Sequence, residues 1–158
     1  VDRQGRFLQG EFFMIHMEVT GPSEGGGWWK ELAGLYLREN MGEPFSIHCW
    51  QDEEAEIQLA LSCGVVQPSN WAYGTEIVGT VTEEFADLLL AHAQYQKQGP
   101  DFGEQMTPFF GVFLGKSFSS SHYGRELDVK ELGGPAGQAL DELLKRLEGK
   151  DWLTVYRY

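Results

Sequence analysis

Basic side chains are scarce in this sequence of 158 residues, which holds 12 Lys and Arg against 24 Asp and Glu and has a net charge of −12. The deficit is concentrated in residues 39–110, where Lys97 is the only base among many acids. A field of this sign repels nucleic-acid phosphates and anionic membrane surfaces, and it attracts basic proteins. We therefore expect no binding to nucleic acid or membranes, and we expect the partner to be a basic protein.

Long apolar runs and cysteine-rich motifs are also missing. No run approaches the roughly 20 apolar residues of a membrane helix, and the first residues lack the basic-then-apolar order of a signal peptide, so the sequence predicts a cytoplasmic protein. The only cysteines are Cys49 and Cys63, and no C-x-x-C pair marks a metal site. A chain of this size can bury a core without a disulfide, so we expect two free, buried thiols and no cofactor.

A phosphate-binding motif is absent as well. The glycine-rich stretch 20–27, TGPSEGGG, lacks the G-x-G-x-x-G spacing of dinucleotide-binding folds and the Lys-Ser/Thr pair of a P-loop. A doubly wound nucleotide-binding fold is therefore not favoured.

What the sequence does contain is a succession of alternating and helical apolar patterns. Strands are predicted over 11–19, 45–50, 75–81 and 151–158, with an extended stretch over 109–124 and a hairpin arm over 125–129. Helices are predicted over 28–40, 52–63, 83–96 and 135–149, where Pro135 opens the last one and Thr82 caps the third. This order predicts a single α+β domain over residues 1–158, with a mixed five- or six-stranded sheet and about four helices packed mainly on one face.

Residues 47–56, IHCWQDEEAE, combine potential ligands with a run of acids. His48 and Cys49 are neighbours on a predicted strand, so their side chains point to opposite faces and do not form one site. Asp52 is the predicted N-cap of the following helix. Acids in its first turn complement the helix dipole.

The second and third predicted helices both begin with acids, and the segment between them carries two exposed-looking aromatic residues. If the two helix starts lie at one edge of the sheet, the acids surround an aromatic centre, which is the anatomy of a protein-binding hot spot. The predicted partner-binding residues are Asp52, Glu53, Glu54, Glu56, Trp71, Tyr73, Glu83, Glu84 and Asp87.

This pattern favours an acidic protein-binding module. By physical analogy with small acidic bacterial proteins of the immunity or antitoxin type, we expect an inhibitor that blocks a basic protein such as a nuclease toxin, acting as a monomer or homodimer. Acids at helix starts also serve solubility, so the same pattern is compatible with no specific partner.

The alternative is a small enzyme or ligand-binding domain with a His/Ser/Cys pocket between sheet and helices. Aromatic residues such as Trp28, Trp29 and Trp50 would line that pocket, together with His16 and His48.

The candidate catalytic residues of this alternative are Ser121 and His122, in the polar segment 117–126, and Cys63. Cys63 lies at a predicted helix end, which raises the pKa of a thiol and opposes reactivity. A metal alternative combines His16, His48 and Cys63, provided that the first two strands are neighbours.

Overall fold

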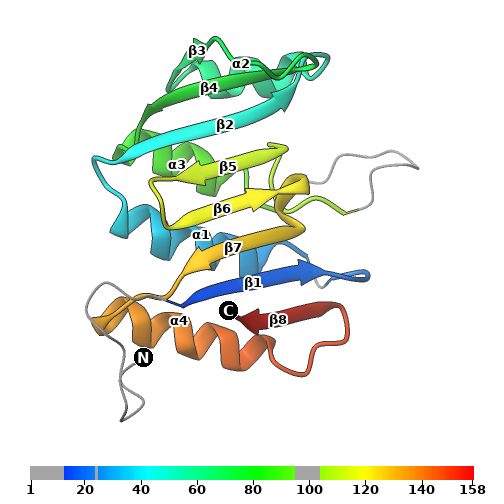
Figure 1. Cartoon of the computed structure of the whole chain (residues 1–158), viewed down its shortest axis with the longest axis vertical. Coiled ribbons are helices and arrows are strands. Elements are labelled where there is room, and N and C mark those ends of the chain that lie inside the picture. Colours follow the sequence, from blue (N-terminus) through cyan, green and yellow to red (C-terminus); the bar gives the residue numbers. More distant parts are fainter. Residues whose placement is uncertain (1–12, 24, 95–103) are drawn as a thin grey trace.

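Eight strands and four α-helices make up the part of the chain that the computed structural model describes, residues 13–23, 25–94 and 104–158. In chain order they are β1 (Met14–Val19), α1 (Gly27–Glu39), β2 (Pro44–Trp50), α2 (Glu54–Leu61), β3 (Val65–Gln67), β4 (Gly74–Thr80), α3 (Glu83–Ala91), β5 (Gly111–Leu114), β6 (Phe118–Ser121), β7 (Glu126–Lys130), α4 (Gly134–Leu147) and β8 (Leu153–Arg157). A short 3-10 turn, η1 (His122–Gly124), links β6 to β7 (Figure 1).

The strands form one antiparallel sheet in the order β3-β4-β2-β5-β6-β7-β1-β8. The predicted α+β class is confirmed, and the chain forms a single α+β domain. The predicted mixed sheet of five or six strands is wrong. Residues 65–67 form β3 where a connection was expected, and the single extended stretch expected over 109–124 folds into the β5–β6 hairpin.

The three-residue strand β3 explains why the sheet is not mixed. A strand, a helix and a second strand in sequence commonly place the two strands parallel. Here β3 reverses the chain before β4, so that β4 pairs antiparallel with β2, from Pro44 opposite Thr80 to Trp50 opposite Gly74. The three predicted strand-then-helix units are present as β1–α1, β2–α2 and β4–α3, and none of them closes a parallel pair.

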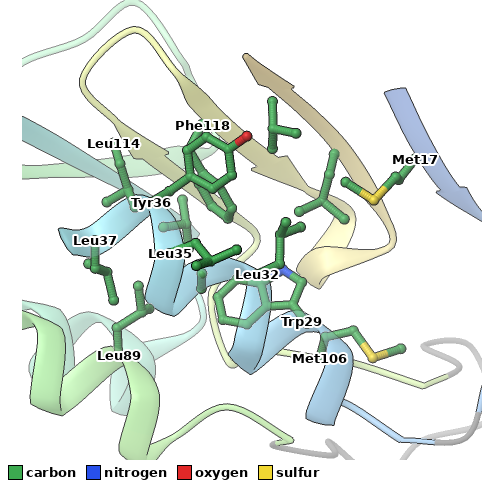
Figure 2. Close-up of a cluster of buried hydrophobic side chains, with 14 of the residues drawn as sticks. Met17, Trp29, Leu32, Leu35, Tyr36, Leu37, Leu89, Met106, Leu114 and Phe118 are labelled. Carbon is green, nitrogen blue, oxygen red and sulfur yellow. The ribbon is translucent and has the colours of Figure 1, made fainter. Parts of the chain in front are cut away.

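The helices cover one face of the sheet and enclose the core. Figure 1 shows α1, α3 and α4 behind the sheet. Figure 2 shows Trp29 of α1 among the buried side chains of the core. Its Nε1 donates to the Ser120 hydroxyl of β6 at 3.2 Å. Phe45 of β2 stacks on Phe85 of α3 with their centroids 3.8 Å apart. A large aromatic side chain thus fixes α1 and another fixes α3 to the same face. The other face is left uncovered by α1, α3 and α4.

Local signals place the helix starts, with one exception. The Thr82 hydroxyl accepts a hydrogen bond from the Phe85 N–H at 3.2 Å, and Pro135 lies in the first turn of α4, as predicted. The prediction of Asp52 as a cap is wrong, because the N-cap of α2 is Glu53. The Glu53 carboxylate turns back to accept the Trp50 N–H at 2.8 Å instead of capping the helix.

Some sequence predictions fall partly on residues outside the described part. Residues 11 and 12 of the first predicted strand lie outside the described residues, and β1 begins at Met14. Residues 95 and 96 of the third predicted helix also lie outside the described residues. Cys49 and Cys63 are both free thiols, the first fully buried and the second partly exposed. None of the helices in the described residues has both the length and the apolar character needed to cross a membrane.

Candidate functional site: the open face of the sheet

The face of the sheet opposite the helices, the open face, carries a continuous row of side chains across all eight strands. Direct cross-strand partners place their side chains on the same face of a sheet. The row consists of Val65, Val78, Ser46, Phe113, Ser119, Asp128, His16 and Tyr156. Phe113 of this row belongs to a group of aromatic rings around β2, and Asp128 and His16 belong to an acidic region at β7 and β1, so the open face has two chemically distinct parts.

Five rings form the aromatic patch: Trp71, Trp50, His48, Phe110 and Phe113. Trp71 lies at the centre, with its ring centroid 4.8 Å from Trp50, 5.5 Å from His48 and 6.0 Å from Phe110. His48 also lies 4.7 Å from Phe113. All five side chains are partly exposed, so the patch presents apolar area to solvent while its rings support one another.

Two glycines make room for this patch. A Cβ at Gly74 would lie 1.9 Å from the Trp71 ring, so Trp71 lies flat over the start of β4 only because that position has no side chain. A Cβ at Gly111 would lie 2.9 Å from Phe113 and 3.1 Å from the His48 Cβ. Glycine thus leaves space on the pleated surface for a large ring above it.

The turn η1 closes one side of the patch in a strained backbone conformation. His122 has φ 51° and Tyr123 has φ 60°, values that side chains other than glycine rarely adopt. The turn is held by the Tyr123 hydroxyl, which donates to Glu53 Oε2 at 3.0 Å, and by the Tyr123 N–H, which donates to the Phe110 carbonyl at 3.2 Å. Burial and the Glu53 carboxylate raise the pKa of Tyr123 well above its ordinary value of 10.0. The phenol therefore stays protonated and keeps donating.

Acidic side chains border the aromatic patch at two places, and we call Asp52, Glu54 and Glu76 the acidic rim. Asp52 and Glu54 are exposed and follow Trp50 at the end of β2. Glu76 lies opposite His48 on β4 and accepts a 3.1 Å hydrogen bond from the Ser46 hydroxyl. A hollow of about 530 Å³ lies beside the patch, lined in part by Ser46, Glu76 and Phe113.

His48 is neutral at ordinary pH within the aromatic patch. Burial among the rings lowers its pKa below the usual 6.5, and the nearby Glu76 carboxylate only partly opposes this effect. The patch is thus apolar above that pKa and gains a positive charge in acid.

The acidic end of the open face is built around His16. Its Nδ1 donates to Asp128 Oδ1 at 2.9 Å, and its Nε2 lies 3.8 Å from Glu18 Oε2. Desolvation lowers the pKa of His16, but the hydrogen bond to Asp128 and the charges of Asp128, Glu126 and Glu18 outweigh it and raise the pKa. One ligand atom each from His16, Glu126 and Asp128 lie within 4.8 Å of one another.

The two predicted acidic helix starts do not meet. Because β2 and β4 run antiparallel, α2 begins at their Trp50 end and α3 begins at their Pro44 end, where the Val81 N–H donates to the Glu43 carbonyl. Six residues of strand separate these ends by about 20 Å. The expectation that both helix starts share one edge is therefore not met, and the acids of α3 (Glu83, Glu84 and Asp87) lie away from Trp71 and Tyr73.

Two of the predicted surface acids are buried. Glu53 is 5% exposed and Glu56 is 7% exposed, so neither is available to a partner. Glu53 instead joins α2 to η1 through its bonds to Trp50 and Tyr123. Of the acids around α2, only Asp52 and Glu54 face solvent. They share this end of the sheet with Tyr73, which is 68% exposed and whose backbone carbonyl accepts a hydrogen bond from the Gln51 N–H.

The residues of the catalytic and metal alternatives are not brought together. His16 and His48 share the open face, but β5, β6 and β7 lie between their strands, a separation of about 19 Å at the usual strand spacing. Cys63 follows α2 on the helix-covered side, with its carbonyl near Gly79 and the Phe45 ring. Ser121 and His122 lie at the open face, where His122 Nε2 is 3.6 Å from Glu126 Oε2, and Cys63 does not join them.

The expected aromatic pocket between sheet and helices does not form from the predicted residues. Trp29 is fully buried core, and Trp28 packs on Trp152 with centroids 6.0 Å apart, both on the helix side. His16, His48 and Trp50 belong to the open face. A hollow of about 620 Å³ between α1 and α4 is lined by Trp28 and Trp152, but also by the paired Glu31 and Arg146.

Sequence patterns alone missed Phe110, Phe113, Glu76 and Asp128, and they included Glu126 only as part of the polar segment 117–126. Each lies on the open face or directly beside it, and the alternation of ELDVK does place Glu126 and Asp128 on one side of a strand. What the sequence does not give is that β7 pairs with β1.

Comparisons with protein-family models, with curated proteins and with solved structures found no match to this chain. What the open face does must therefore be inferred from its geometry and chemistry.

Proposed function

We propose that this domain is a protein-binding module, and that the aromatic patch with its acidic rim is the surface that docks a basic protein. The observation that carries the proposal is the set of five contacting rings on a sheet face that α1, α3 and α4 leave uncovered. Tryptophan and tyrosine dominate the energy of protein interfaces, and partly exposed apolar patches mark such interfaces.

The charge of the chain supports a cationic partner. The net charge of −12 steers basic proteins toward the domain, and Asp52, Glu54 and Glu76 border the rings that a partner would contact. Arginine suits such a surface, because its guanidinium stacks on tryptophan and also pairs with a carboxylate. The hollow beside Ser46, Glu76 and Phe113 can accept a side chain of this kind.

In its most specific form, the proposal is an inhibitor of the immunity or antitoxin type. Such a protein would cover the active surface of a cationic toxin, for example a nuclease whose own substrate is polyanionic. Three features support this form of the proposal: the net negative charge of the domain, the aromatic patch as an anchor for a partner, and the small α+β fold.

The test begins with capture of a partner on the immobilised domain at low salt, followed by binding measurements with that partner purified. The double variant Asp52→Asn/Glu54→Gln should slow association at low salt several-fold, and this difference should shrink at high salt. The matched double variant Glu83→Gln/Glu84→Gln removes the same charge at the other end of β2 and β4, and it should associate more nearly like the wild type.

A second variant tests the rings. Trp71→Ala should weaken binding by about 2 kcal/mol or more, mainly through faster dissociation, as expected for a hot-spot residue. Unchanged binding of Trp71→Ala, or an equal effect of the two charge variants, would contradict the proposed surface. If the partner is an enzyme, an equimolar amount of the domain should stop its activity; full activity in the complex would contradict the inhibitor form.

A further inference from the structure

Three side chains with metal-ligating atoms meet at the border of β1 and β7, away from the aromatic patch. His16 is the direct cross-strand partner of Asp128, and Glu126 lies two residues before Asp128 on the same face. One ligand atom from each of the three lies within 4.8 Å of the other two. Because these residues lie on paired strands, the sheet hydrogen bonds fix the spacing of their backbones.

The imidazole of His16 is held in place from two sides. It is only 8% exposed, its Nδ1 donates to Asp128 at 2.9 Å, and its ring lies against Tyr156 with centroids 4.9 Å apart. The Tyr158 hydroxyl donates to the same Asp128 Oδ1 at 2.8 Å. The Tyr158 hydroxyl is an outer partner of the kind that orients metal-ligating carboxylates in proteins. The His16–Asp128 bond lies within the ligand set, and an ion would replace its proton.

Three carboxylates meet at this border of β1 and β7. Glu18, Glu126 and Asp128 lie together, and the ion pairs found for them among the described residues are with His16 and His122 alone. An imidazole carries at most one charge, and only when protonated. A divalent cation would relieve the repulsion among the three carboxylates more completely.

We propose that His16, Asp128 and Glu126 form a binding site for a divalent first-row transition metal ion such as Zn²⁺ or Mn²⁺. One imidazole with two carboxylates is a ligand set that these ions accept, whereas Ca²⁺ and Mg²⁺ prefer oxygen ligands alone. Glu18 lies at the other ring nitrogen of His16, 3.8 Å from Nε2, and is the direct cross-strand partner of Glu126, so it adds negative charge beside the site.

The ligand atoms must shift slightly around an ion, because His16 Nδ1 and Asp128 Oδ1 are 2.9 Å apart and must separate, whereas wider pairs must approach. Zinc bonds of about 2.0–2.1 Å in a tetrahedral site place ligand atoms about 3.4 Å apart. The 4.8 Å limit of the present arrangement exceeds this spacing by little more than 1 Å. The side chains of Glu126 and Asp128 are 39% and 33% exposed, so rotation of their carboxylates can supply the movement without a change in the sheet.

The test is calorimetric titration of the chelator-treated, dialysed chain with ZnCl₂, MnCl₂ and CaCl₂. We expect one Zn²⁺ per chain, with affinity reduced at least tenfold in His16→Gln and in Asp128→Asn. The control His92→Gln, which removes an exposed histidine at the end of α3, should bind Zn²⁺ as the wild type does. Ca²⁺ should bind at least tenfold more weakly than Zn²⁺.

The result that would overturn the site is Zn²⁺ binding that is absent, that survives His16→Gln, or that Ca²⁺ matches. Thermal unfolding in chelator shows whether the variants are folded. Imidazole ¹⁵N spectra of the wild-type chain give a readout that needs no variant: the ring nitrogens of His16 should shift on addition of one equivalent of Zn²⁺, and a spectrum in which His16 stays unchanged contradicts the site. This outcome is independent of the proposed docking function, because the aromatic patch contributes no ligand.

Discussion

The Tyr123 hydroxyl lies 3.0 Å from Glu53 Oε2, and this hydrogen bond joins the strained turn η1 to the start of α2. Both residues are buried, at 8% and 5% exposure. The contact links segments 70 residues apart in the chain, and the Tyr123 ring lies 5.4 Å from that of Phe110, a member of the aromatic patch. This hydrogen bond therefore helps to position Phe110 by tying the turn to the start of α2.

Tyr123→Phe should lower the free energy of unfolding by about 1–3 kcal/mol, because the buried Glu53 carboxylate loses a donor that water cannot replace. Urea unfolding measures the difference. The matched control is Tyr156→Phe, which removes the hydroxyl of a residue that is 50% exposed and should lower the free energy of unfolding by less. Equal stabilities of the two variants would show that the Tyr123 bond contributes nothing.

Gly74→Ala should displace Trp71 from the sheet, since the added Cβ would lie 1.9 Å from its ring. We expect a changed near-ultraviolet circular dichroism spectrum and weaker partner binding, with the secondary structure kept. Gly133→Ala is the control, because its Cβ would meet no atom within 4 Å and its φ is −101°. A wild-type spectrum of Gly74→Ala would mean that Trp71 does not pack on this position.

The stability of the domain should depend on His48 in mild acid. Burial lowers the pKa of His48 in the folded state, so the unfolded chain takes up a proton first as the pH falls through 6.5. His48 therefore makes the domain less stable as the pH falls from 6.5 toward its folded pKa. As the pH is lowered from neutral to below 6.5, the free energy of unfolding should fall less steeply in His48→Gln than in the wild type. A His48→Gln slope equal to the wild-type slope would contradict the burial of a neutral imidazole.

Much of the fold followed from local patterns, whereas the site depended on pairing. Thr82 and Pro135 mark helix starts through short-range chemistry, so they were predictable. The strand β3 was not, because three exposed residues bounded by Pro68 show no periodicity. Because β3 was not predicted, the chain reversal that places the starts of α2 and α3 at opposite ends of β2 and β4 was not predicted either. This is why the sequence wrongly placed the two acidic helix starts at one edge.

The candidate site shows the same division. Trp71 was predicted as a binding residue from its place between two acidic helix starts, and it does lie at the centre of an aromatic patch. Its neighbours Phe110 and Phe113 come from a segment more than 35 positions later, and only the β2–β5 register brings Phe113 beside Ser46. Likewise His16 was recognised as a potential ligand, but its partner Asp128 is defined by the pairing of β1 with β7.

The most direct measurement of the central claim is site-specific photo-crosslinking of the bound basic partner from two exposed positions. A crosslinking residue at position 73 is exposed and lies two residues from Trp71, at the Trp50 end of the sheet, and one at position 87 lies on α3. If the aromatic patch and its acidic rim form the docking surface, position 73 should crosslink in high yield and position 87 should not. Strong crosslinking from position 87 with none from position 73 would place the partner on the helix side and contradict the proposed function of the open face.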